Sequence, residues 1–158
     1  RKDSALSRQG IPDYLVTVRK LGDNPEPCAG PFTDFAGENP PAKTGDAIKD
    51  SINIWQRYAS PVWMDINPSD TLQYRSARAN EDERHICPLQ LEVIRRGLQL
   101  WSNPGDLVLS PFAGIGSEGH VSLQMGRKFV GFELKPSYFN CAVKNLTAAD
   151  SIKQGELV

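Results

Sequence analysis

The residues best suited to chemistry are two glycines in a tight turn and an acidic residue further along the chain. Gly114 and Gly116 follow a short apolar run, Leu107–Leu109, that predicts a buried strand. A turn without side chains lets backbone N–H groups and the next helix N-terminus approach a ligand. Glu133 lies about 20 residues further on, at the end of a second predicted strand, where an acid can accept hydrogen bonds from a ribose. The pattern predicts a site for an adenosine-containing cofactor.

Helices around this turn must hold it in place, and the sequence predicts them on both sides. Before the turn, apolar residues recur at spacings of three and four and give one apolar face. Pro88 suits the first turn of that helix. We expect the two strands to be parallel, the helix between them to join them, and the preceding helix to pack on the same sheet. The expected strands cover residues 107–111 and 128–133, and the expected helices cover residues 88–101, 117–126 and 136–146.

Two other interpretations of the turn stay open on this pattern alone. Gly114, Gly116 and Gly119 also satisfy the G-x-G-x-x-G pattern of nicotinamide and flavin dinucleotide sites, and such a turn can also bind nothing. Chain order disfavours a dinucleotide, because that fold opens with its glycine turn and several strands follow. Here the residues after Glu133 suffice for one helix and a tail. The other strands of the sheet must therefore come from earlier in the chain.

Several stretches around the turn add a more specific signal. They are His85 with Pro88-Leu89-Gln90, Gly105-Asp106, Ser110-Pro111-Phe112-Ala113-Gly114-Ile115-Gly116-Ser117, and Gly131-Phe132-Glu133-Leu134-Lys135-Pro136-Ser137-Tyr138. Together they resemble the DNA methyltransferases that modify exocyclic amines, most closely the phage-type members. The resemblance is tight over residues 85–146 and looser over residues 7–20 and 55–66. It implies a permuted motif order in which the cofactor-binding half comes last.

The resemblance implies an α/β, Rossmann-like fold for S-adenosyl-L-methionine, present here as an incomplete fragment. The parent reaction would move the methyl group to the N6 amine of adenine or the N4 amine of cytosine in double-stranded DNA, with the base flipped out. Cys87, Ser110 and Ser117 stand where many members have Lys, Asp and Thr. The residues that it implies contact the cofactor are His85, Cys87, Pro88, Ser110, Phe112, Ala113, Gly114, Gly116, Ser117 and Glu133.

The catalytic signature of this family, an (Asp/Asn/Ser)-Pro-Pro-aromatic tetrapeptide, has no full match in the chain. Its polar group holds the target amine and its ring stacks on the flipped base. Asn39-Pro40-Pro41-Ala42 lacks the ring, and Ser60-Pro61-Val62-Trp63 lacks the second proline. We interpret them as loop prolines and a packed tryptophan. We expect the true tetrapeptide upstream of Arg1 in a longer parent protein, so the catalytic residues are unknown and the fragment alone is expected to be inactive.

The chain divides into four expected regions. Residues 1–21 contain a strand, Asp13–Lys20, that is rich in β-branched residues and belongs to the methyltransferase sheet. Residues 22–84 are a loop-rich candidate target-recognition region, in which residues 22–51 carry many Gly and Pro breakers. Residues 85–148 are the S-adenosyl-L-methionine-binding half, and residues 149–158 are a tail.

The composition is typical of a soluble intracellular domain, and the resemblance to phage-type members implies the cytosol of a bacterial host. The net charge of −1 requires any DNA contact to come from local basic patches. No apolar run reaches the ~18 residues of a membrane-spanning helix. Three scattered cysteines indicate reduced thiols, and two histidines without a Cys-x-x-Cys predict no metal site. A non-catalytic nucleic-acid-binding module with a vestigial cofactor fold, and a dinucleotide-binding oxidoreductase domain, are the alternative functions.

Overall fold

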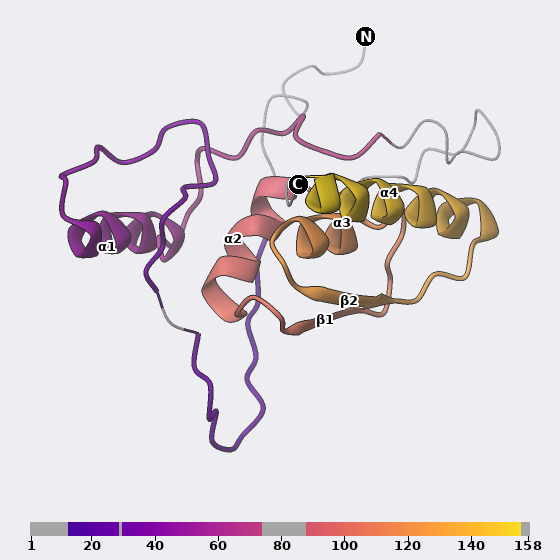
Figure 1. The fold of residues 1–158 in the computed structure, drawn as a ribbon, viewed down its shortest axis with the longest axis horizontal. Coiled ribbons are helices and arrows are strands. Elements are labelled where there is room, and N and C mark those ends of the chain that lie inside the picture. Colours follow the sequence, from indigo (N-terminus) through magenta and orange to yellow (C-terminus); the bar gives the residue numbers. More distant parts are fainter. Residues whose placement is uncertain (1–12, 29, 74–87, 156–158) are drawn as a thin grey trace, which may run out of the picture.

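The computed structural model describes residues 13–28, 30–73 and 88–155, and four helices and two strands lie within them (Figure 1). In chain order they are α1 (Ala47–Tyr58), α2 (Leu91–Trp101), β1 (Leu107–Ser110), α3 (Ser117–Gln124), β2 (Lys128–Gly131) and α4 (Pro136–Gly155). The order agrees with the α/β class expected from the sequence.

β1, α3 and β2 form the strand–helix–strand unit that the glycine turn predicted. The two strands are parallel, and their register pairs Leu107 with Lys128 and Ser110 with Gly131. Two further backbone hydrogen bonds continue the pairing at the C-terminal ends of the strands. They run from Phe132 N–H to Ser110 O and from Ala113 N–H to Phe132 O. The prediction of two parallel strands joined by a helix is therefore confirmed.

α3 is the central element of this part of the molecule. It contacts both strands, α2 and α4, and Figure 1 shows it between the strands and α4. The absence of a side chain at Gly119 allows this closeness, because a Cβ there would stand 2.6 Å from the ring of Phe129 on β2. α3 thereby covers one face of the strand pair. On the other face three side chains are more than 60% exposed, namely Leu107, Leu109 and Phe132.

The expectation that the helix before β1 packs on the sheet is wrong. α2 contacts α3 and α1 but makes no packing contact with either strand. Its buried residues Leu91 and Ile94 form an apolar cluster with Val121 of α3. Because α3 already covers the near face of the strands, the apolar face of α2 finds its partner on α3.

The tail expected at residues 149–158 is largely helical, which is a second correction. α4 runs to Gly155, although only the backbone of residues 152–155 is described. No Gly or Pro interrupts the sequence between Ser137 and Gln154, and Ala149 is fully buried. The helix therefore extends beyond the apolar pattern from which its end was predicted.

The strand expected at Asp13–Lys20 is not formed. These residues have no regular secondary structure, and several of their apolar side chains are exposed, namely Tyr14, Leu15, Val16 and Val18. The sheet of the described residues contains β1 and β2 alone. A segment with strand propensity needs a neighbouring strand to pair with, and none lies beside this one in the described residues.

α1 begins inside the segment that the sequence predicted as loop, residues 22–51. Asp46 caps it, since one carboxylate oxygen accepts hydrogen bonds from Ile48 N–H at 3.0 Å and Lys49 N–H at 3.3 Å. Ile54 and Tyr58 face inward and are buried. An aspartate before an amphipathic stretch is a helix start signal, which the many glycines and prolines upstream of it obscured.

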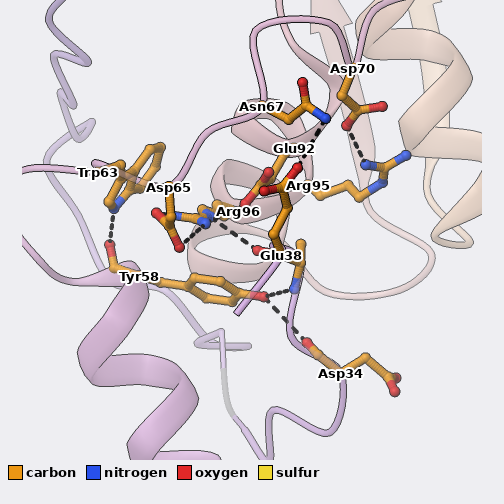
Figure 2. Close-up of polar contacts among 11 residues, drawn as sticks. Asp34, Glu38, Tyr58, Trp63, Asp65, Asn67, Asp70, Glu92, Arg95 and Arg96 are labelled. Carbon is orange, nitrogen blue, oxygen red and sulfur yellow. Dashed lines mark hydrogen bonds and ion pairs between the residues drawn. The ribbon is translucent and has the colours of Figure 1, made fainter. Parts of the chain in front are cut away.

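Arg96 of α2 connects this N-terminal region to the rest of the molecule (Figure 2). Its side chain is 1% exposed, and its guanidinium donates two hydrogen bonds to Asp65, at 3.0 and 2.9 Å. It also pairs with Glu92, one turn earlier on α2, and its Nε donates to Ala36 O at 3.2 Å. Two segments distant in sequence are thus bonded to one side chain of α2.

Aromatic rings enclose the same guanidinium. Its central carbon lies 5.5 Å from the ring centres of Phe35 and Tyr58 and 5.2 Å from that of Trp63. The Tyr58 hydroxyl accepts a hydrogen bond from Ala36 N–H at 2.6 Å, and Trp63 donates to Tyr58 O at 3.0 Å. Segment 34–38, α1 and segment 58–65 are therefore packed around Arg96; we call these residues the Arg96 cluster.

Candidate cofactor site

The glycine turn lies between the end of β1 and the start of α3. Gly114 and Gly116 have φ angles of 54° and 86°, a left-handed conformation that glycine adopts without strain. A Cβ at Gly114 would meet no atom within 4 Å, so open space borders the backbone there. The backbone at Gly114 therefore has room beside it for a ligand.

Glu133 lies directly against this turn. Its Oε2 accepts a hydrogen bond from Gly114 N–H at 2.9 Å, and its Oε1 accepts one from Lys135 N–H at 2.8 Å. Each carboxylate oxygen has a second lone pair, and the side chain is partly exposed. Glu133 can therefore hold the turn and still accept hydrogen bonds from the hydroxyl groups of a ligand.

α4 holds the opposite side of the turn. The amide of Asn145 donates to Ile115 O at 2.8 Å. A Cβ at Gly116 would stand 2.6 Å from Leu146 Cδ1 and 3.2 Å from Ala142 Cβ. Position 116 therefore requires glycine for two reasons, its left-handed φ angle and its close approach to α4. No pattern in the sequence indicated Asn145, because its role depends on the docking of α4.

Most residues predicted to contact the cofactor gather at this turn. Ser110, Ala113, Gly116 and Ser117 are buried in it, and the Phe112 ring is 85% exposed beside it. Pro88 stands half-buried at the entry to α2. His85 and Cys87 lie outside the described residues, so their predicted contacts stay predictions.

The first turn of α3 carries a second acidic side chain. Burial raises the pKa of the Glu118 carboxyl above its ordinary value. Glu133 and Glu118 thus differ in their surroundings near the turn, since Glu133 is bonded to backbone N–H groups and Glu118 is partly buried. Among residues 13–28, 30–73 and 88–155, no three potential metal ligands gather, and no helix there has the length and apolar character to span a membrane.

Neither near match to the tetrapeptide lies at the glycine turn. Trp63 packs over Arg96 and donates its indole N–H to Tyr58 O, which supports its interpretation as a packed tryptophan. Ser60 Oγ donates to Val62 O within its own segment. Pro40 and Pro41 line a cavity beside α1, and α1 contacts α2 but not the strands or α3.

The family of this chain follows from its sequence over nearly its whole length. The DNA methylase family of N6 and N4 methyltransferases matches residues 13–144. The chain belongs to this family, and the strand–turn–helix–strand unit is the part of a Rossmann-like fold that the resemblance implied. The match favours the methyltransferase interpretation over a dinucleotide oxidoreductase or a vestigial module.

Individual relatives match about half of the chain. DNA adenine methyltransferase YhdJ of Escherichia coli strain K12 is 36% identical over 78 residues, which cover 49% of this chain and 26% of that protein. Type II methyltransferase M.Cfr9I of Citrobacter freundii is 40% identical over 67 residues, or 42% and 22% of the two chains. The chain thus spans about a quarter of the length of these relatives.

A solved structure gives a partial superposition. The putative DNA modification methylase TTHA0409 of Thermus thermophilus, in complex with S-adenosyl-L-methionine, is 27% identical and superposes with a TM-score of 0.46. The superposed region covers 61% of this chain and 32% of that one.

Proposed function

We propose that this chain is the cofactor-binding part of a DNA methyltransferase that acts on an exocyclic amine of adenine or cytosine. S-adenosyl-L-methionine would bind at the turn between Ser110 and Ser117, facing Glu133. The observation that carries the proposal is the contact of the Glu133 carboxylate with Gly114 N–H, within a chain whose residues 13–144 match the DNA methylase family.

The residues at the turn fit this cofactor. Its ribose hydroxyls are donors that suit the remaining lone pairs of Glu133. The open space at Gly114 admits a ligand against the backbone, and the exposed ring of Phe112 offers an apolar surface beside it. When bound, the cofactor supplies an electrophilic methyl group on sulfur. The residues of this chain would bind and orient it, and a longer protein would supply the tetrapeptide that holds the amine.

The DNA side of the proposal concerns the region before α2. We propose that residues 22–84 contribute to recognition of the target sequence in double-stranded DNA, in the cytosol of a bacterial host. The Arg96 cluster supports this, because it fixes segments 34–38 and 58–65 on α2. A recognition surface held on a rigid element reads DNA more accurately than a free loop. The family includes both N6 and N4 enzymes, so the proposal covers both bases.

Titration calorimetry with S-adenosylhomocysteine tests the cofactor site. We expect binding by the chain, and Glu133→Ala should weaken it by about 1–3 kcal/mol, the loss of a charged hydrogen-bond partner. Glu38→Ala, an exposed acid far from the turn in sequence, should leave the affinity unchanged. Thermal unfolding of both variants separates a loss of binding from a loss of fold. Tight binding of a nicotinamide dinucleotide, with no response to S-adenosylhomocysteine, would contradict the proposal.

A further inference from the structure

A cavity of about 400 Å³ lies between the loop of residues 31–43 and α1. Its lining includes two aromatic residues, Phe32 and Phe35, the aliphatic Ile54, and two charged residues, Asp34 and Lys43. The volume falls in the range of small-molecule sites. α1 contacts α2 and lies on the far side of α2 from the strands in Figure 1, so the cavity is separate from the cofactor turn.

The loop that encloses the cavity is bonded to α1 at several points. Phe32 N–H donates to Ser51 Oγ at 2.8 Å, and both the N–H and the hydroxyl of Thr44 donate to Asp50 Oδ1 at 2.7 Å. Between these two points, Ala36 N–H donates to the hydroxyl of Tyr58, near the end of α1. The cavity therefore exists before a ligand arrives, which lowers the entropic cost of binding.

Of the two phenylalanines in the lining, Phe32 has no stacked aromatic partner among the described residues. Phe35 stacks on Tyr58, with ring centres 5.5 Å apart and an angle of 12° between planes. The Phe32 and Tyr58 rings are nearly perpendicular, at 85°, with centres 6.2 Å apart, so Tyr58 does not stack in parallel on Phe32. A flat ring could stack on Phe32, an interaction that all nucleobases provide.

The charged residues of the lining indicate which functional groups a ligand with such a ring needs. The Asp34 carboxylate points away from Tyr58 in Figure 2, although the Asp34 carbonyl oxygen accepts a hydrogen bond from the Tyr58 hydroxyl. Asp50 Oδ1 already accepts two hydrogen bonds from Thr44. Among the described residues the Asp34 carboxylate accepts one, from the Thr33 hydroxyl to Oδ2 at 3.0 Å, so Asp34 is the less occupied acceptor for an N–H donor. Lys43 adds a positive charge to the same lining. The complementary ligand has a flat ring, an amine and an anionic group.

We propose that this cavity binds a cytosine nucleotide of DNA, read apart from the base that is methylated. The base would stack on Phe32, its N4 amine would donate to Asp34, and its phosphate would lie near Lys43. Carboxylates are the usual acceptors for cytosine N4. A basic peptide would also pair with Asp34, but Lys43 would repel it. The inference rests on the proposed function, because it names a base-reading site within the candidate target-recognition region.

Ligand-observed NMR titrations with dCMP, dTMP and deoxycytidine test the proposal, with saturating S-adenosylhomocysteine in every sample to occupy the cofactor turn. We expect dCMP to bind about threefold or more tightly than dTMP, which lacks the amine, and than deoxycytidine, which lacks the phosphate. Asp34→Asn should remove the preference for dCMP over dTMP, and Lys43→Gln should remove the preference for dCMP over deoxycytidine. Phe32→Leu should weaken the binding of all three ligands. Trp55→Ala, an exposed change on α1 outside the cavity, should alter none.

Equal binding of dCMP and dTMP to the unaltered chain would overturn the proposal. Tighter binding of the tripeptide acetyl-Lys-Leu-Lys-amide than of dCMP would also overturn it, and would assign the cavity to a protein partner. A separate titration with S-adenosylhomocysteine alone keeps the two proposals distinguishable. Cofactor binding without any dCMP preference refutes the cavity assignment only, whereas no cofactor binding refutes the proposed function.

Discussion

Arg96 and Asp65 are joined by two parallel hydrogen bonds of 3.0 and 2.9 Å, although 31 residues separate them in the chain. This two-pronged geometry is the strongest form of an arginine–carboxylate contact. Removing a guanidinium from water is costly, and only a complete set of partners offsets that cost. The guanidinium has three such partners, namely Asp65, Glu92 and the carbonyl oxygen of Ala36. The Arg96–Asp65 pair therefore joins the N-terminal region to α2 only while all three contacts are present.

Arg96→Met should destabilise the chain by about 3–5 kcal/mol, the usual effect of breaking a buried ion pair. Methionine retains much of the volume but leaves the buried carboxylate of Glu92, which is 4% exposed, without its cation. Urea unfolding followed by circular dichroism measures the change.

Arg95→Met is the matched control on the next residue of α2. Among the described residues Arg95 has one ion pair, with Asp70 at 2.9 Å, and its side chain is 33% exposed. Pairs of this kind contribute about 0–1 kcal/mol. Equal losses of unfolding free energy in the two variants would mean that burial of the Arg96 guanidinium does not increase its contribution to stability.

The stability of the chain should fall at acid pH because of Asp65. Hydrogen bonds from Arg96 hold the pKa of the Asp65 carboxyl below its ordinary value of 3.8. A depressed folded-state pKa gives stability that is fully present above the ordinary pKa and is lost as pH falls through the folded one. Thermal unfolding between about pH 6 and pH 2.5 should show this loss. Asp65→Asn should be less stable at pH 6 and should have a weaker pH dependence below the ordinary pKa.

Gly116→Ala should destabilise the chain more than Gly105→Ala. Both glycines have left-handed φ angles, 86° and 88°, and the conformational cost for alanine is roughly 1–2 kcal/mol at each. A Cβ at Gly105 meets nothing within 4 Å, whereas one at Gly116 would overlap Leu146. This overpacking adds about 1–3 kcal/mol. Equal melting temperatures of the two variants would show that α4 does not press on the turn.

The glycine turn could be predicted because all of its determinants are close in sequence. An apolar run, Gly114, Gly116 and a following helix are local signals, and they correctly placed β1, α3 and β2. Glu133 was predicted to bind a ligand. It also accepts a hydrogen bond from Gly114 N–H, and this contact depends on the register between the strands. Register of this kind is set by tertiary pairing.

The errors arose where a segment depends on a distant partner. Asp13–Lys20 has strand propensity but no neighbouring strand among the described residues. The burial of Arg96 was not predicted, since arginine is seldom buried and two of its partners, Ala36 and Asp65, are far from it in the chain. α2 was assigned to the sheet, whereas its apolar face packs on α3. Periodicity identifies the apolar face of a helix but not the element that covers it.

This chain alone should transfer no methyl group from labelled S-adenosyl-L-methionine to DNA, while a longer protein that includes a complete tetrapeptide should. Positioning of the amine in line with the methyl group supplies much of the rate. Neither near match can position it at the turn, since Trp63 packs on Arg96 and Pro40 lines the cavity beside α1. A filter-binding assay with the chain, a longer protein and a no-protein blank makes the comparison. If the chain methylates DNA, Trp63→Ala and Asn39→Ala identify which near match acts, provided that thermal unfolding shows the variant to be folded. Loss of activity in a folded Trp63→Ala variant would make segment 60–63 catalytic and contradict the structural role of Trp63 argued above.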